Sequence, residues 1–451
     1  MPGDFASEVL DEARRAAASA ELPAADATDI PFVTVDPPGS RDLDQAVHIA
    51  RGSDEFVISY AIADVAAFVT PGGALDIEAH RRGETLYFPD TRVPLHPPAL
   101  SEDAASLLPG VIRPAVLWTI RLAPDGTVRS TDVRRARVRS TAQLDYDGVQ
   151  AALDAGTLPD PLTALRDVGK LRLGLARERH AIDLDLPEQV VVRDGDSGWS
   201  LELRHELPIE RYNAEISLLT GMCAAEIMLA GGVGILRTVP PPDQGAVASL
   251  RRAAKALGIP WPSDAQPGDV LDLVDRGNPR HVAFIEHAVA LLRGAAYTPF
   301  DGTPPEPRLH SGIGAPYAHV TAPLRRLVDR YAAEICLALH AGTPVPDWVR
   351  TALPALPDEM RRADQVAHEV DRAAVDATEA WLLRDRVGEL FPAVVIEADA
   401  HAATVVLDNP AVRGRSTGRR LHVGERIDVR LTTADVTNRQ VRFEHAKLKT
   451  T

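Results

Sequence analysis

Three aspartates lie close together in the segment TVDPPGSRDLDQA: Asp36, Asp42 and Asp44. If RDLDQ is extended, Asp42 and Asp44 project to one side of the backbone and Leu43 to the other, and the DPPGS turn can return Asp36 to the same place. Carboxylates this close repel one another unless a cation lies between them, and hard oxygen ligands favour Mg²⁺ or Mn²⁺ over zinc. The segment therefore predicts a divalent-metal site. A solvated turn with helix caps, or a calcium loop, is the alternative that the spacing leaves open.

Arginines form two further groups whose positive charges could bind phosphates. On a strand, one face of VRRARVRS carries Arg135, Arg137 and Arg139. Such a face is typical of a local path for a nucleic-acid backbone, and a solvated strand face is the alternative. A second group lies in PAVRGRSTGRRL: Arg413, Arg415, Arg419 and Arg420. Few aromatic residues accompany it, with Phe443 alone near a strand centre, so contact with phosphates is favoured there over base stacking.

The pattern of apolar residues predicts the elements that must position these groups. Residues 5–20 are typical of one short amphipathic helix, and residues 32–139 of short strands separated by Pro/Gly turns. Residues 141–180 and 208–345 are mostly helical by periodicity, with a helix end at Gly231-Gly232. One long charged helix is expected over 357–390, followed by alternating segments sufficient for a small barrel of OB type.

Composition limits the classes of protein. The chain has 451 residues, room for two or three domains, and its 49 Lys+Arg against 64 Asp+Glu give a net charge of −15. A generic basic nucleic-acid coat is excluded, so any nucleic-acid site must be local. Cys223 and Cys336 lie in apolar helical stretches, which excludes a disulfide framework or a cysteine zinc site. The acidic N-terminal segment is unlike a signal peptide, so we expect a soluble, cytoplasmic protein.

Several longer motifs resemble one family. The segment DPPGSRDLDQA, the run YAIADVAAFVTPGGALDIEAHRRGETLYFPDTRVPLHPPALSEDAASLLPG, and the later VRSTAQLDYDGV and HSGIGAPYAHVTAPLRRLVDRY are similar to the RNB catalytic domain of the ribonuclease II / ribonuclease R family. The resemblance spans about residues 30–345. It implies an α+β fold, with a mixed β-sheet wrapped by helices and a small C-terminal OB-like, S1-like barrel. The expected divisions are an N-terminal helical extension (1–30), the catalytic domain (31–390) and the barrel (391–451).

The resemblance also implies an activity and a set of site residues. Members are 3′→5′ exoribonucleases that hydrolyse single-stranded RNA to nucleoside 5′-monophosphates, with Mg²⁺ held by aspartates at the bottom of a narrow channel. Asp36, Asp42 and Asp44 match the first three family acids, and Arg325 matches the arginine that approaches the scissile phosphate. Arg326 would be its phosphate-tracking neighbour, and both arginines would otherwise only solvate a helix N-terminus. The residues expected to contact RNA are Tyr87, Tyr146, Arg326, Arg137 and Arg139.

The chain departs from the family in two places. Gln45 stands where well-known members have a fourth aspartate; its carbonyl oxygen can still ligate a metal, but one negative charge is lost, so a second Mg²⁺ should bind less well or Mn²⁺ be preferred. Only about 30 residues precede Phe32, too few for the two cold-shock domains of typical bacterial members.

Three functions follow from these observations. We expect a monomeric enzyme acting on single-stranded RNA, without an organic cofactor or a membrane partner. The alternative is an RNA-binding protein on an RNB scaffold whose nuclease activity is weakened or lost through Gln45. A metal-dependent phosphodiesterase acting on small nucleotides is a third possibility.

Overall fold

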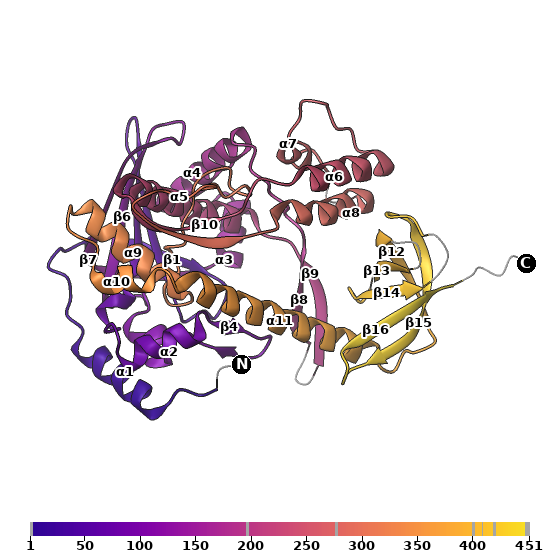
Figure 1. Cartoon of the computed structure of the whole chain (residues 1–451), viewed down its shortest axis with the longest axis horizontal. Coiled ribbons are helices and arrows are strands. Elements are labelled where there is room, and N and C mark those ends of the chain that lie inside the picture. Colours follow the sequence, from indigo (N-terminus) through magenta and orange to yellow (C-terminus); the bar gives the residue numbers. More distant parts are fainter. Residues whose placement is uncertain are drawn as a thin grey trace, which may run out of the picture.

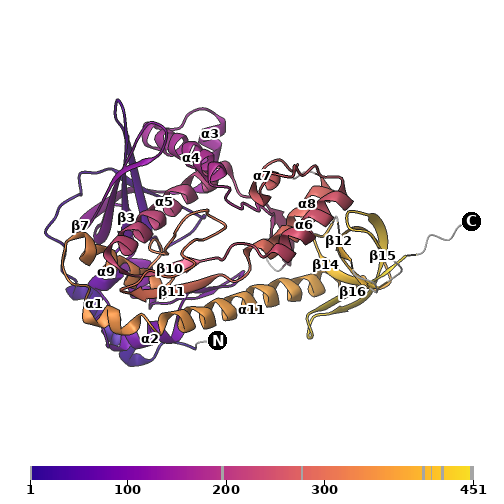
Figure 2. The ribbon, with the colours of Figure 1, turned by 45° about the horizontal axis from the view of Figure 1, so that its top comes forward.

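Two closed five-stranded barrels stand at opposite ends of the molecule, and a long helix runs between them (Figure 1 and Figure 2). The structure is a computed structural model, and it describes residues 3–194, 198–275, 278–398, 402–407, 409–417 and 421–446. Helices cover the first barrel, whereas the second is a small β unit at the C-terminal end. The expected α+β class with an OB-like C-terminal barrel is confirmed.

The first barrel is formed by the strand-rich region near the N-terminal end of the chain. Its strands are β1 (Phe32–Asp36), β2 (Gln45–Arg51), β3 (Phe56–Ala63), β6 (Ile112–Leu122) and β7 (Val128–Asp145). Neighbours are antiparallel from β1 to β7, and the barrel closes where β1 pairs in parallel with β7. Tyr60 on β3 lies directly opposite Trp118 on β6, and both side chains are buried. Closure leaves no exposed strand edge.

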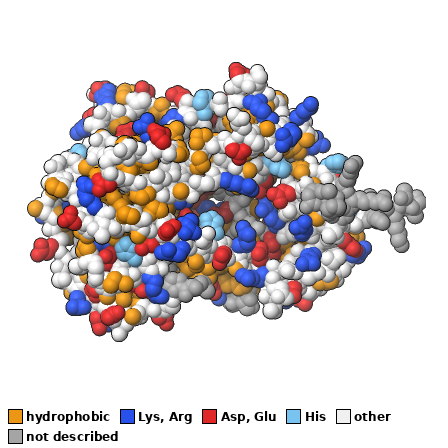
Figure 3. Space-filling view, viewed as in Figure 1, with side chains coloured by type: hydrophobic (Ala, Val, Ile, Leu, Met, Phe, Trp, Pro, Cys, Tyr) orange, Lys and Arg blue, Asp and Glu red, His pale blue; other side chains and the backbone are white. Residues whose placement is uncertain are grey.

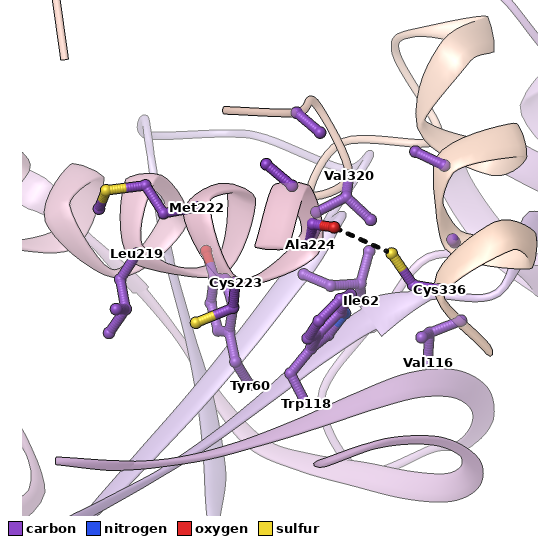
Figure 4. Packing of buried hydrophobic residues seen from close by; sticks show 14 of the residues in the cluster. Tyr60, Ile62, Val116, Trp118, Leu219, Met222, Cys223, Ala224, Val320 and Cys336 are labelled. Carbon is purple, nitrogen blue, oxygen red and sulfur yellow. Dashed lines mark hydrogen bonds between the residues drawn. The ribbon is translucent and has the colours of Figure 1, made fainter. Parts of the chain in front are cut away.

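Helix α5 (Pro208–Gly231) packs its apolar residues against this barrel. Figure 4 shows Cys223 of α5 facing Tyr60 and Trp118, with Cys336 from helix α9 (Leu327–His340) beside the α5 backbone. By length and composition α5 is apolar enough to cross a membrane, and 56% of its most apolar window is buried inside the structure. A Cβ at Gly221 would lie 2.2 Å from the Tyr317 ring, so a glycine is required where α5 meets the segment before α9.

The other helices and strands complete the covering layers. The helices are α1 (Ser7–Ser19), α2 (Ala74–Arg82), α3 (Tyr146–Asp154), α4 (Asp160–Glu178), α6 (Gln244–Leu257), α7 (Pro267–Leu271), α8 (Pro279–Ala288) and α10 (Asp347–Ala352), with shorter turns at Val65–Ala67, Leu100–Ala104 and Val289–Leu292. The two-stranded pairs are β4 (Leu86–Tyr87) with β5 (Arg92–Val93), β8 (Glu188–Asp194) with β9 (Gly198–Arg204), and β10 (Val233–Thr238) with β11 (Ala296–Asp301). The predicted N-terminal helix and the stop after Gly231 are confirmed; β10 and β11 interrupt a region predicted as mostly helical.

The long helix α11 (Leu356–Leu383) leads directly into the second barrel. The strands of this barrel are β12 (Leu390–Ala398), β13 (Ala402–Leu407), β14 (Arg413–Thr417), β15 (Arg426–Asp435) and β16 (Gln440–His445). Phe443 is buried in its core, so its ring is not a surface for stacking bases. Glu379 of α11 accepts hydrogen bonds from Gln189 Nε2 and the Arg413 backbone N–H, each at 2.7 Å. This buried carboxyl therefore ties α11, β8 and the barrel together.

Candidate active site

The three predicted aspartates lie at one rim of the first barrel. Asp36 is the last residue of β1, and Gln45 is the first residue of β2, so Asp42 and Asp44 belong to the connection between these strands. The parallel pairing of β1 with β7 places Asp36 opposite Asp145, directly before Tyr146. Closure of the barrel thus gathers residues from three separate segments.

The connection between β1 and β2 is anchored by Leu43. Its side chain is fully buried. Its backbone N–H donates to the Ser106 hydroxyl oxygen, and its carbonyl accepts from the Leu107 N–H, each at 3.0 Å. Residues 41–44 are not part of a strand, yet the predicted alternation holds, because Leu43 turns into the core between two acids. Asp42 and Asp44 are thereby fixed at the rim.

Asp44 is paired with Arg325. One carboxylate oxygen accepts from the Leu324 backbone N–H and the other from Arg325 Nε, each at 2.7 Å. Asp44 is only 1% exposed, and burial raises its pKa to about 7 even with Arg325 beside it. The ionised form therefore depends on these two donors remaining in place. Arg325 uses Nε for this pair, and within the described residues its two terminal nitrogens have no hydrogen-bond partner.

The segment that carries Arg325 is held on both sides. Asp329 accepts from the Ala322 backbone N–H and binds Arg326 through Nε and a terminal nitrogen. On the other side, Thr85 N–H donates to the Arg325 carbonyl at 2.9 Å. Arg326 was expected to track phosphates, but its guanidinium is bound to the buried carboxylate of Asp329, so its main contact is structural.

Asp36 and Asp42 lie near each other but have different surroundings. Burial raises the pKa of Asp36 to about 6, with Thr34 and Arg325 partly offsetting this and the Asp42 charge adding to it. Within the part of the chain that the structure describes, one carboxyl oxygen of Asp36 is buried without a hydrogen-bond partner. Asp42 accepts from the Tyr87 hydroxyl at 2.9 Å and from Arg92 at 3.1 Å. Of these two acids, Asp36 is therefore the one with an oxygen that can still accept a hydrogen bond or coordinate a cation.

The expected convergence of all three carboxylates is not what the structure contains. Across the described ranges, no three acidic, histidine or cysteine side chains gather into a group that could hold a metal ion. Two of the three acids are paired with arginines instead: Asp42 with Arg92, and Asp44 with Arg325. Asp36 and Asp42 remain as a neighbouring pair of acids.

Gln45 makes two hydrogen bonds with its side-chain amide. Nε2 donates to the Thr321 carbonyl at 2.8 Å, and Oε1 accepts from the buried Tyr60 hydroxyl at 2.5 Å. The Thr321 hydroxyl in turn lies 2.7 Å from that of Ser217 on α5. The amide therefore links β2, β3 and the segment leading to Arg325.

The two predicted tyrosines occupy different positions. Tyr87 is 44% exposed as a residue, and its hydroxyl donates to Asp42. Tyr146 is half-buried, and its hydroxyl accepts from Asn213 Nδ2 of α5 at 3.1 Å. Tyr87 lines a pocket of about 280 Å³ together with Arg325, whereas Tyr146 lies at the Asp36 side.

The same pocket contains Glu84, which sequence reasoning missed. Its carboxyl has no hydrogen bond or ion pair among the described residues, and burial, reinforced by Asp364, raises its pKa to about 7. Only the backbone pairing of Glu84 with Arg326 brings it there. A lone glutamate in RRGETLYFP gives no spacing signal, so only the fold could identify it.

The arginines of β7 do not reach this rim. Arg135 pairs with Asp64 and Glu334, and Arg137 binds Asp26 of the N-terminal segment at 2.7 Å. Arg137 precedes Asp145 by eight residues in one strand, which corresponds to about 26 Å. Arg139 is exposed on the same strand. Arg135 and Arg137 therefore fasten neighbouring elements to the barrel, and an RNA path along this face stays a prediction.

Comparisons with known proteins agree with the architecture. Residues 24–340 match the RNB domain, and residues 389–446 match the RNase II-type exonuclease C-terminal S1 domain. The chain is 31% identical over 368 residues to the exosome complex exonuclease RRP44 homolog A of Arabidopsis thaliana, covering 76% of this chain and 38% of that protein. It is 26% identical over 456 residues to ribonuclease R of Aquifex aeolicus, covering 91% of this chain and 63% of the relative.

A solved structure shares the fold. Mycoplasma genitalium RNase R in complex with ribose methylated single-stranded RNA superposes with a TM-score of 0.87 at 21% identity, over 99% of this chain and 76% of that one. The chain spans less than two thirds of the length of the two relatives above. With two consecutive domain matches and the rim just described, the chain belongs to the RNB family, with an RNase II-type S1 domain at its C-terminal end.

Proposed function

We propose that this chain is a hydrolytic 3′→5′ exoribonuclease that degrades single-stranded RNA to nucleoside 5′-monophosphates. The observation that carries the proposal is the Asp44–Arg325 pair at the rim of an RNB domain, with the two terminal nitrogens of Arg325 left for a substrate. A guanidinium in this state can bind a phosphodiester and stabilise the charge that develops on it. Relatives named ribonuclease R support the same activity.

The acids of the rim fit a divalent cation. Hard carboxylate oxygens suit Mg²⁺ or Mn²⁺. A cation could coordinate the unpartnered buried oxygen of Asp36, which has Asp42 beside it. Asp36, Asp42 and Asp44 are the proposed ligands, Asp44 only if Arg325 releases one of its oxygens. When bound, the cation would supply charge neutralisation at the phosphate and a more acidic attacking water.

The protein residues then act by positioning. Arg325 would hold the last phosphodiester, because Asp44 and Leu324 fix its direction. The exposed Tyr87 ring and Tyr146 would seat the 3′-terminal nucleotides by stacking, which does not depend on base identity. A hollow near the middle of the face in Figure 3 has Lys and Arg side chains along its rim, as expected for a strand that must approach an acidic protein.

A second function has one specific observation in its favour. Gln45 leaves the rim with one negative charge fewer than a fourth aspartate would give, which suits a protein that binds RNA but degrades it slowly or not at all. In either case we propose that the chain acts as a monomer in the cytoplasm.

A time course with a 5′-labelled single-stranded oligoribonucleotide tests the proposal, with Mg²⁺ or Mn²⁺ added. Shortening by single nucleotides to a short end product, with 5′-monophosphates released, is the expected result. Arg325→Ala should abolish the ladder, whereas Arg121→Ala, on an exposed arginine of β6, should not. Retention of full-length RNA by stoichiometric wild-type protein would overturn the nuclease and support the binding protein.

A further inference from the structure

Gln45 lies where three segments of the first barrel meet at the active-site rim. Its Nε2 donates to the Thr321 carbonyl at 2.8 Å, and its Oε1 accepts from the Tyr60 hydroxyl at 2.5 Å. Gln45 and Thr321 are 276 residues apart in the chain. A side chain that joins such distant segments through both ends of one amide restricts how they move relative to each other.

The segment that Gln45 contacts is the one that carries Arg325. Thr321 stands four residues before Arg325, and its hydroxyl lies 2.7 Å from that of Ser217 on α5. The residue directly before β2, Asp44, contacts the same segment at the Leu324 N–H and at Arg325 Nε. Two consecutive residues, Asp44 and Gln45, therefore make three hydrogen bonds to the segment between Thr321 and Arg325.

Only a neutral amide of this length can make both of the Gln45 contacts. An aspartate is one methylene shorter and has no N–H, so it can accept from Tyr60 but cannot donate to the Thr321 carbonyl. A glutamate keeps the length but places an oxygen against that carbonyl. A carboxylate here would also lie next to buried Asp44, where a second negative charge is costly.

We propose that Gln45 is a positioning residue: through Thr321 it fixes the segment that carries Arg325, so that Arg325 stays in register with Asp44, and it does not ligate the divalent cation. The role in turnover rests on the proposed nuclease function. Where a fourth aspartate would add a negative charge, the Gln45 amide instead makes a hydrogen bond that fixes the position of the Arg325 segment.

The test compares three variants with a surface control. Gln45→Met removes both hydrogen bonds without adding charge. Gln45→Glu keeps the length, loses the donor and adds a negative charge, and Gln45→Asp adds the same charge on a shorter side chain that also lacks the donor. Gln244→Glu, at an exposed glutamine of α6, controls for added charge. For all three Gln45 variants we expect kcat to fall roughly 10- to 100-fold, as for a misplaced catalytic group, with KM for RNA and the half-saturating Mg²⁺ concentration changed less than about twofold.

A second readout does not need catalysis. In the metal-free protein, backbone amides of residues 322–327 should exchange with deuterium about tenfold faster in Gln45→Met than in the wild type, while those of α5 do not change. Mn²⁺ affinity measured by titration should be the same in both. Tyr60→Phe, which removes one of the two contacts, should give a smaller increase in exchange, and it serves where a Gln45 variant does not fold.

The outcomes separate the two proposals. If Gln45→Asp raises kcat and tightens Mg²⁺ or Mn²⁺ binding, Gln45 occupies a metal-ligand position and the positioning role is overturned. Unchanged exchange over 322–327 in Gln45→Met overturns it as well. If the wild-type chain degrades no RNA but the exchange rises as expected, the nuclease proposal fails while the contact between Gln45 and the Arg325 segment stands.

Discussion

The two barrels of this protein have the same number of strands but place their charges differently. In the first barrel the charged groups of the site lie at a rim, partly or fully buried and in pairs such as Asp44 with Arg325. In the second barrel the charges lie on the outer faces of strands, where burial alternates residue by residue: exposed arginines 413 and 415 of β14 flank buried Gly414. The first barrel therefore has fixed groups at its rim, whereas the second has charges of both signs dispersed over its exposed strand faces.

The difference follows from the connections rather than from the strands. In the first barrel, residues 37–44 and 321–326 cross the rim and are fixed there by hydrogen bonds with Asp329, Gln45 and Ser106. The second barrel is a short-stranded unit whose core of aliphatic residues and Phe443 leaves every other side chain to solvent. A reaction requires groups held in fixed positions, as at the rim of the first barrel. Contact with the phosphates of a polyanion requires only exposed basic side chains, such as those on the strands of the second barrel.

The largest effect should come from the rim of the first barrel. Asp44→Asn removes the carboxylate that aligns Arg325, and we expect kcat on single-stranded RNA to fall by about 10³-fold or more, with KM changed little. Single-turnover kinetics at saturating RNA measure this. Asp428→Asn, at an exposed aspartate of β15, is the matched change in the second barrel and should leave kcat unaltered. Equal losses in the two variants would remove the distinction between the barrels.

The converse change weakens the surface of the second barrel. Arg415 on β14 and Arg442 on β16 lie at paired positions. Replacing both by alanine should raise KM about tenfold without changing kcat, and should reduce the slope of log K against log salt by about 1.4, near 0.7 for each phosphate contact with a single strand. Equilibrium RNA binding at several salt concentrations checks it. Arg129→Ala with Arg134→Ala, on the outside of the first barrel, is the control.

The sequence alone predicts the elements with local patterns well. The short helix α1, the core helix α5 with its glycine end and the long helix α11 follow from periodicity and stop signals, and the acids of DPPGSRDLDQA mark the rim. Helix α11 ends at Leu383, earlier than expected, because residues 384–389 turn before β12 begins. Arg419 and Arg420 of the predicted arginine cluster lie outside the described residues.

What the sequence does not predict is which distant residue each charge meets. The sequence does not show that Arg137 forms an ion pair with Asp26, or that Arg326 forms one with Asp329. Glu84 reaches the pocket only because residues 83–85 pair with 325–327. Such pairings depend on tertiary contacts that no local spacing encodes.

A third prediction concerns the junction between α11 and the second barrel. Burial raises the pKa of Glu379 from 4.5 to about 7, although the Arg413 N–H and Gln189 oppose this. A raised pKa means that the folded state holds the proton more tightly, so this contribution to stability is complete below pH 4.5 and is lost as the pH rises through about 7. Glu379→Gln stays neutral, and we expect it to be more stable than the wild type by about 1 kcal/mol at pH 8 and equal at pH 4.5.

Urea unfolding followed by tryptophan fluorescence measures this difference, since Trp381 lies on α11 close to the junction. The first barrel has the same type of residue at Glu55, which is partly exposed and paired with Arg121, so Glu55→Gln is the control for loss of a carboxylate. A Glu379→Gln variant less stable than the wild type at pH 8 would mean that the ionised carboxylate is the form that joins the barrel to α11.

The smallest effect is expected at Glu84, where the rim of the first barrel has a carboxyl without a partner. Burial and the nearby Asp364 raise its pKa to about 7, while Arg326, His368 and Arg237 oppose this. Below pH 7 the neutral acid leaves the pocket without this negative charge, and above pH 7 the carboxylate repels an incoming phosphodiester.

Glu84→Gln should therefore lower KM for RNA about threefold at pH 8 and leave KM unchanged at pH 6. The rise of KM between pH 6 and pH 8 should be smaller in the variant than in the wild type. Steady-state KM measured from pH 5.5 to 8.5 checks this, and because Asp44 titrates in the same range the comparison is between variant and wild type at each pH. Parallel profiles would show that Glu84 does not sense the substrate's charge, and the first barrel's site would then depend on its paired charges alone.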